Sequence, residues 1–353
     1  MAATLPATAT VPPRGSSSDG DELAVGEACV DGDTDRGDHR PYEVTRADVL
    51  AAAERIAPYV RRTPVLALER GAFGVPCRLV CKLELHQHAG SFKTRGAFNR
   101  LLTSDRAADA GVCAASGGNF GTAVAYAAGV LGIRATVFVP EISSPAKVAR
   151  LRELGAEVVV TGREYADALD ACRRRVEETG ADMPHAYDDH AVVAGAGTLA
   201  RELLDEEPDL DTIVVAVGGG GLLGGIASWV RGDVRVVAVE STGTPTLARA
   251  VAAGEPVDVE VGGLVADSLG ARRIGDHGFA AASRWVDTRV QLHDDRIREA
   301  QRRLWRDARI ACEPAAAAPL AALGPERYVP EADECVALVV CGGNVDLATL
   351  ARP

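Results

Sequence analysis

Lys93 is the residue whose type and surroundings most directly suggest chemistry. The chain has three lysines, Lys82, Lys93 and Lys147, among many arginines. Arginine keeps its charge at any working pH, whereas burial can lower the pKa of a lysine until a free amine is available. A free amine can condense with an aldehyde. Lys93 lies in the segment Ser91-Phe92-Lys93-Thr94-Arg95-Gly96-Ala97, and this setting favours it as the reactive lysine.

A glycine-rich turn provides the second chemical feature. The segment Gly218-Gly219-Gly220-Gly221-Leu222-Leu223-Gly224-Gly225 follows an apolar run and precedes a predicted helix. Exposed backbone N–H groups and a helix N-terminus together bind phosphate groups well. The spacing of Gly219, Gly221 and Gly224 also fits the GxGxxG pattern of dinucleotide-binding proteins, with Glu240 about twenty residues later as a ribose ligand. On this segment alone, a phosphate turn and a nicotinamide or flavin site both remain open.

Two further small polar turns follow predicted strands. Ser116-Gly117-Gly118-Asn119 offers a hydroxyl, an amide and bare N–H groups, although Ser116 or Asn119 could simply cap the next helix. Cys341-Gly342-Gly343-Asn344 follows the last apolar run, and its cysteine could simply fill space in the core. Three such turns and a lysine that opens a helix suggest a cofactor with both a phosphate and an aldehyde.

Strands and helices are predicted to alternate along most of the chain, because short apolar runs are bounded by glycine, proline or polar residues. Thr45 with Asp48 predicts the start of the first helix, and Gly155 the end of another. Strands are predicted at residues 79–84, 111–115, 135–139, 157–160, 212–217, 234–239 and 336–340, and helices at 45–59, 93–102, 120–131, 145–154 and 165–179. Apolar strands that alternate with helices form parallel sheets covered on both faces. The fold class is therefore α/β.

The composition is that of an acidic globular protein long enough for two domains. The 353 residues are 47% hydrophobic and 25% charged, with a net charge of −12, which argues against a nucleic-acid partner. No apolar run reaches the roughly 18 residues of a membrane span. Residues 1–40 are acidic and contain almost no large apolar residue, so we expect a disordered extension. Because this extension lacks the features of a targeting segment, we expect a cytoplasmic protein.

Neither the cysteines nor the histidines predict a metal site. The eight cysteines contain no CxxC pair, and reduced thiols are the default in a chain of this size. His86 and His88 have no third ligand at a fitting spacing. We therefore expect no bound metal.

In combination and in this order, the motifs resemble the fold-type II pyridoxal-phosphate enzymes, and among them the serine/threonine dehydratases. The resemblance extends from about Tyr42 to Leu350 and includes the stretches 187–198 and 313–317. It implies pyridoxal 5'-phosphate as cofactor, a homodimer as the family default, and two domains. Each domain is a mainly parallel sheet flanked by helices, as in the tryptophan synthase β subunit. The large cofactor-binding domain would comprise residues 41–110 and 189–353, and the small domain residues 111–188.

The resemblance also implies roles for individual residues. Lys93 is similar to the Schiff-base lysine, which also removes the α-proton of the substrate. Asn119 would bind the ring hydroxyl, and Cys341 would face the pyridine nitrogen as a weak donor. The implied cofactor-binding residues are Phe92, Lys93, Asn119, Gly218, Gly219, Gly220, Gly221, Leu222 and Cys341. The implied substrate-carboxylate residues are Ser116, Gly117, Gly118 and Asn119.

The expected activity is a pyridoxal-phosphate-dependent deaminating dehydratase, a lyase that converts L-threonine or L-serine into a 2-oxo acid and ammonia. The alternatives are β-replacement of the cysteine-synthase type and elimination from 3-hydroxyaspartate, whose acidic side chain Ser268 and Arg272-Arg273 could bind. A nucleotide-dependent oxidoreductase is the remaining alternative.

The sequence also departs from patterns of similar enzymes. Gly117 stands where amino-acid racemases carry a serine that donates a proton, so racemisation is not expected. Thr246 stands where a carboxylate would complete a cation site near Glu240, and Phe120-Gly121 replaces a more usual His-Ala pair.

Overall fold

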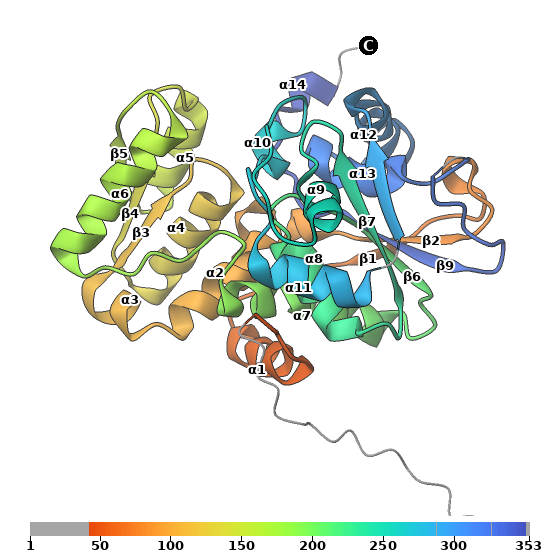
Figure 1. Cartoon of the computed structure of the whole chain (residues 1–353), viewed down its shortest axis with the longest axis horizontal. Helices are drawn as coiled ribbons and strands as arrows, with labels where there is room; N and C mark the ends of the chain where they lie inside the picture. Colours follow the sequence, from red (N-terminus) through yellow and green to blue (C-terminus); the bar gives the residue numbers. More distant parts are fainter. Residues whose placement is uncertain (1–41, 287, 326, 351–353) are drawn as a thin grey trace, which may run out of the picture. The chain divides into compact units, whose positions relative to one another are not determined.

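Two β-sheets, each built mainly from parallel strands, carry the fold (Figure 1). The computed structural model describes residues 42–286, 288–325 and 327–350, so the predicted disordered extension at 1–40 lies outside the described residues. The larger sheet has the strand order β1-β2-β9-β6-β7-β8, and the smaller sheet has the order β3-β4-β5. In the larger sheet β1 is antiparallel to β2, and the other pairs are parallel. The α/β fold class is confirmed.

The strands of the larger sheet are β1 (Val65–Ala67), β2 (Arg78–Lys82), β6 (Thr212–Ala216), β7 (Arg235–Ser241), β8 (Thr288–Leu292) and β9 (Cys335–Val339). Those of the smaller sheet are β3 (Val112–Ala115), β4 (Ala135–Val139) and β5 (Glu157–Val160). Every residue of β6 and β9 is buried. This burial agrees with their unbroken apolar sequences, since parallel strands are covered on both faces.

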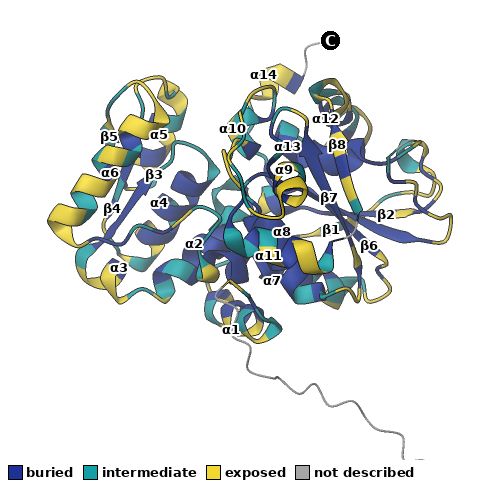
Figure 2. Ribbon diagram, viewed as in Figure 1, coloured by how far each residue is buried: buried dark blue, intermediate teal, exposed yellow. Residues whose placement is uncertain are grey.

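The helices cover both sheets, and Figure 2 shows their buried faces turned toward the strands. They are α1 (Arg46–Ile56), α2 (Lys93–Leu102), α3 (Asp105–Ala110), α4 (Asn119–Leu131), α5 (Pro145–Glu153), α6 (Tyr165–Thr179), α7 (His190–Glu206), α8 (Gly221–Val230), α9 (Thr246–Ala253), α10 (Ala266–Leu269), α11 (Asp276–Trp285), α12 (Asp294–Ala308), α13 (Pro314–Ala321) and α14 (Leu347–Leu350). Helix α13 packs on β6, β7 and β9, while α4 and α6 pack on β3 and β4. No helix within these described ranges is both long and apolar enough to cross a membrane.

Local sequence signals account for several helix ends. Helix α1 begins with a capping box, in which the backbone N–H of Asp48 donates to Thr45 Oγ1 and that of Thr45 donates to the Asp48 carboxylate. Helix α5 is followed by Gly155 at φ +86°, a left-handed conformation that favours glycine. Both predicted ends are confirmed.

Some element predictions were incomplete or wrong. The strand predicted at 79–84 ends at Lys82, and Glu84 begins a short 3-10 helix, η2 (Glu84–His86). Strands β1 and β8 were not predicted. Strand β1 is apolar but has only three residues, and β8 alternates buried and exposed side chains at the edge of the sheet, so its sequence has no continuous apolar run.

Candidate active site

The predicted site residues line one cavity of about 1210 Å³. The three glycine turns reach it because they follow β3, β6 and β9, and the carboxyl ends of parallel strands are the usual place for a ligand. The predicted residues in the cavity wall are Phe92, Lys93, Ser116, Gly117, Gly118, Asn119, Gly218, Gly219, Gly220, Gly221, Leu222 and Cys341. Segments far apart in the sequence therefore meet around one space.

Lys93 is the first residue of α2, and its amine points into this space. The Nζ atom donates to the carbonyl oxygen of Ala186 at 2.7 Å, and it lies 5.1 Å and 5.8 Å from the ring centroids of Phe92 and Phe120. Burial lowers the pKa of Lys93 to about 8, because the charged amine loses contact with water. A substantial fraction of the amine is therefore neutral near neutral pH and able to act as nucleophile or base.

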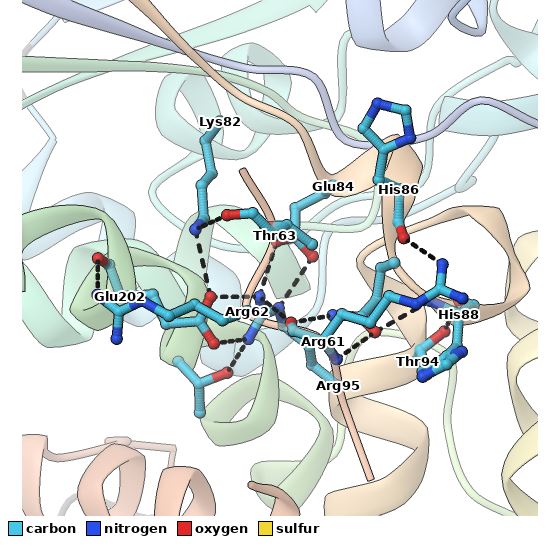
Figure 3. A network of polar contacts seen from close by, with 12 residues as sticks. Arg61, Arg62, Thr63, Lys82, Glu84, His86, His88, Thr94, Arg95 and Glu202 are labelled. Carbon is cyan, nitrogen blue, oxygen red and sulfur yellow. Dashed lines mark hydrogen bonds and ion pairs between the residues drawn. The ribbon is translucent and has the colours of Figure 1, made fainter. Parts of the chain in front are cut away.

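A buried network of charged groups fixes helix α2 two residues beyond Lys93 (Figure 3). The Arg95 guanidinium is fully buried and forms ion pairs with Glu84 at 2.8 Å and with Glu202 at 2.7 Å. Lys82 donates to the carbonyl oxygen of Thr63 at 2.7 Å and to Glu202 at 3.2 Å. Because every charge has an opposite partner, the network joins α2, η2 and α7 without leaving a lone buried charge.

The other two lysines have structural partners, which separates them from Lys93. Lys82 belongs to the buried network. Lys147, on α5, forms an exposed ion pair with Asp267 on α10 at 2.6 Å, and both residues line the cavity. Lys82 and Lys147 both pair with carboxylates, whereas the amine of Lys93 donates to a backbone carbonyl oxygen, and its reactive role stays a prediction.

The turn at residues 218–221 is shaped for backbone contact with an anion. A Cβ atom on Gly219 would lie 2.2 Å from Cγ of Tyr187, and one on Gly218 would lie 2.9 Å from the Cα of Leu269. Gly220 has φ +86° and precedes the first residue of α8, Gly221. Side chains cannot be accommodated here, so bare backbone and the N-terminal end of α8 line the cavity, an arrangement that suits a phosphate group.

The turn at residues 116–119 joins β3 to the start of α4. Gly118 is the N-cap, and no side chain caps this helix, so the structural alternative in which Ser116 or Asn119 caps α4 is wrong. The N-terminal end of α4 opens to the cavity beside the Ser116 hydroxyl. The helix dipole at the N-terminal end of α4 and the Ser116 hydroxyl would stabilise a bound carboxylate.

Cys341 contributes a neutral group to the cavity wall. The side chain is buried, and burial raises the pKa of its thiol, so it carries no charge at working pH. Its backbone oxygen accepts a hydrogen bond from the N–H of Phe92 at 3.0 Å. The amine, the phosphate-type turn and the neutral thiol together fit a ligand with an aldehyde, a phosphate and a ring nitrogen that stays unprotonated.

Sequence reasoning missed three residues around the site. The Tyr187 ring lies over Gly219, and its backbone lies against Gly221. Glu313 lines the cavity and accepts from Asn119, and Asn344 donates to Asn119 from outside the cavity wall. The stretches that contain Tyr187 and Glu313 were noticed only through the family resemblance, and no local spacing indicated these contacts.

Glu240 has a different role from the one that a dinucleotide site would need. Its buried carboxylate accepts from the N–H groups of Leu247 and Ala248, at 2.6 Å and 2.9 Å, and from Thr246 Oγ1 at 3.2 Å. The carboxylate therefore caps α9 and is not part of the cavity wall. The nucleotide-dependent alternative loses the acidic residue that it requires.

The residues predicted to bind an acidic substrate side chain lie partly in the cavity and partly outside it. Ser268 and Arg272 line the cavity, while Arg273 is exposed outside its wall. His88 stacks on Tyr126 with a 4.9 Å separation of ring centroids. Among the residues with described positions, no group of three or more His, Cys, Asp or Glu side chains could hold a metal ion.

Comparisons with known proteins agree with this geometry. Residues 56–342 match the family model described as pyridoxal-phosphate dependent enzyme. The chain is 37% identical to an L-threonine ammonia-lyase of Geobacter sulfurreducens, over 86% of this chain and 76% of that protein. It is 38% identical to a phenylserine dehydratase of Ralstonia pickettii, over 84% of this chain and 92% of that protein. The structure of maize serine racemase is similar, with a TM-score of 0.82 and 33% sequence identity, and the match covers 88% of this chain and 96% of that chain. The chain belongs to the family of pyridoxal-phosphate-dependent enzymes.

Proposed function

We propose that this pyridoxal-phosphate-dependent enzyme is a deaminating dehydratase, a lyase that converts L-threonine or L-serine into a 2-oxo acid and ammonia. The observation that carries the proposal is the Lys93 amine, with a pKa of about 8, in a cavity that also contains the turns at 116–119 and 218–221. The relatives named L-threonine ammonia-lyase and phenylserine dehydratase support elimination as the reaction class.

The cofactor supplies an aldehyde that links to the amino group and a conjugated ring that withdraws electrons from the α-carbon. Lys93 would hold the aldehyde, the 218–222 turn the phosphate, and Cys341 would face the ring nitrogen. A neutral thiol is a weak donor and does not protonate that nitrogen. The ring then withdraws electrons moderately, which favours prompt loss of the β-substituent.

The protein residues account for binding and proton transfer. Ser116 and the N-terminal end of α4 bind the substrate carboxylate, which orients the α-hydrogen. Lys93 would be released from the aldehyde when the substrate amino group takes its place, and its neutral amine would then take the α-proton at Nζ. The C–H electron pair forms the new Cα–Cβ double bond, the Cβ–O bond breaks, and the leaving hydroxyl takes a proton from the Lys93 ammonium to become water. Hydrolysis of the unsaturated amine product then yields the 2-oxo acid and ammonia.

Two measurements test the proposal. The purified protein is incubated with L-serine, L-threonine, phenylserine and 3-hydroxyaspartate, and both 2-oxo acid and ammonia are quantified. Borohydride reduction and peptide mapping then identify the labelled lysine, with Lys82 and Lys147 as internal controls. We expect equimolar 2-oxo acid and ammonia from threonine or serine and a label on Lys93. Labelling of another lysine, or no product from any of these amino acids, would contradict the proposal.

A second candidate is elimination from 3-hydroxyaspartate, because Ser268 and Arg272 line the cavity and could bind a second carboxylate. This candidate predicts that Arg272→Met lowers kcat/KM for 3-hydroxyaspartate more than for serine. A β-replacement activity would instead appear as consumption of serine together with an added thiol, without release of 2-oxo acid.

Racemisation is disfavoured although a serine racemase is structurally similar. Gly117 has no side chain to donate a proton from the wall of the 116–119 turn, and Ser143 Oγ is the polar atom nearest to its virtual Cβ, at 3.4 Å. We expect L-serine to yield pyruvate without D-serine, which chiral chromatography of the reaction mixture will measure.

A further inference from the structure

Glu313 and Asn344 contact the two ends of the Asn119 side-chain amide. Asn119 Nδ2 donates to both carboxylate oxygens of Glu313, at 2.8 Å and 2.9 Å. Asn119 Oδ1 accepts from Asn344 Nδ2 at 2.7 Å. Both ends of this amide therefore have defined partners from the C-terminal part of the chain, about two hundred residues away.

The two partners lie on different sides of Asn119. Glu313 is buried and lines the cavity with Asn119, while Asn344 lies outside the cavity wall. The amino group of Asn119 is consequently turned toward the cavity and its carbonyl oxygen away from it. The reversed orientation would place this oxygen against the Glu313 carboxyl and the Asn119 amino group against the amino group of Asn344, so the three hydrogen bonds would be replaced by unfavourable contacts.

Asn344 and Glu313 are themselves held in place. Asn344 Nδ2 also donates to the carbonyl oxygen of Ala89 at 2.9 Å. A Cβ atom on Gly90 would lie 2.3 Å from Asn344 Oδ1, so the absence of a side chain there makes room for this amide. The backbone N–H of Glu313 donates to the carbonyl oxygen of Gly342 at 3.0 Å. The turn after β9 thus positions the partners of a residue on α4.

We infer that Glu313 and Asn344 are positioning residues that hold the Asn119 amide with its amino group toward the cofactor. The inference rests on the proposed contact between Asn119 and the cofactor ring hydroxyl. An amino group offers two N–H donors, so one can bind Glu313 while the other remains for a ring oxygen. Burial raises the pKa of Glu313, and Gln is therefore a conservative replacement that keeps an acceptor in this position.

The test compares substitutions that keep or invert each hydrogen bond in the holoenzyme. Asn344→Asp is nearly isosteric and replaces a donor with an acceptor, while Glu313→Leu removes the acceptor and Glu313→Gln retains it. Cofactor release on dialysis is followed through the visible absorption band, and the wavelength of this band is recorded before release. The melting temperature of each variant without cofactor reports whether the fold itself has changed.

We expect release at least about tenfold faster and a shifted band in Asn344→Asp and Glu313→Leu, about the effect of one hydrogen bond. Glu313→Gln should stay within about threefold of the unchanged protein. In an Asn119→Ala background the same substitutions should have little further effect, because coupled residues are not additive. If Glu313→Leu does not fold, Asn344→Asp still tests the inference, since Asn344 is exposed.

The inference is overturned if Asn344→Asp and Glu313→Leu release the cofactor at the unchanged rate with an unchanged band. It is also overturned if their effects persist in full without the Asn119 side chain. No substrate is needed for these measurements. A failure of the proposed dehydratase reaction would therefore appear as missing 2-oxo acid with cofactor binding intact, and the two failures can be distinguished.

Discussion

The lowered pKa of Lys93 predicts that this lysine destabilises the protein without cofactor near neutral pH. Burial lowers the pKa from 10.5 to about 8 in the folded protein, whereas the unfolded chain keeps the ordinary value. Well below pH 8 the amine is charged in both states, and the folded protein bears the full loss of hydration. Between pH 8 and pH 10.5 the folded state has lost its proton and the unfolded state has not, so stability rises with pH in this range.

The magnitude follows from the same pair of pKa values. Between pH 7 and pH 10 the contribution of Lys93 to the free energy of unfolding should rise by about 2–3 kcal/mol. At pH 7.5 about a quarter of the Lys93 amines are neutral, compared with about one in a thousand for an ordinary lysine. The same desolvation that destabilises the fold therefore makes the amine reactive.

The substitution Lys93→Met tests this reasoning, because Met keeps the unbranched shape and removes the amine. Urea unfolding of the cofactor-free protein is measured for both forms at pH 7 and pH 10. We expect Lys93→Met to be more stable at pH 7, and its advantage to shrink by about 2–3 kcal/mol at pH 10. The control Lys147→Met removes a lysine in an exposed ion pair and should change stability by less than about 1 kcal/mol. An equal difference between Lys93→Met and the unchanged protein at both pH values would refute the assigned burial effect.

Three further predictions concern other parts of the structure. Gly219→Ala should weaken cofactor binding at least about tenfold, because its Cβ would collide with Tyr187. Gly262→Ala, whose Cβ would meet nothing within 4 Å, is the matched control. Equal cofactor affinities of the two variants in a titration would contradict the steric argument. Glu84→Leu should lower the free energy of unfolding by about 3–5 kcal/mol, because Arg95 would lose a fully buried partner. Urea unfolding measures this free energy. A loss below about 1 kcal/mol would show that the Arg95–Glu84 ion pair does not stabilise the fold. Adding Mg²⁺ or EDTA should leave the melting temperature unchanged, because the Glu240 carboxylate already accepts hydrogen bonds from α9. A rise of several degrees with Mg²⁺ would contradict the role of Glu240 as a cap of this helix.

Local sequence patterns predicted much of the architecture. The helix at 93–102, the helix at 165–179 and the strands at 135–139 and 157–160 agree with the structure at both ends. These elements are bounded by short-range signals, and the apolar pattern of 135–139 matches its burial, although the strand at 157–160 is only partly buried. The edge strands β1 and β8 were missed because β1 has only three residues and β8 lacks a continuous apolar run.

The sequence by itself determined the candidate lysine, the three turns and the α/β order of elements, because each depends on residue type and short-range spacing. Only the tertiary structure decided which groups meet. Arg95 pairs with Glu202, 107 residues away, and Asn119 with Glu313, 194 residues away. Glu240 accepts a hydrogen bond from the backbone at the N-terminus of α9 and does not line a nucleotide site. The lowered pKa of Lys93 likewise arises from burial, which exists only after distant segments have packed together and excluded water.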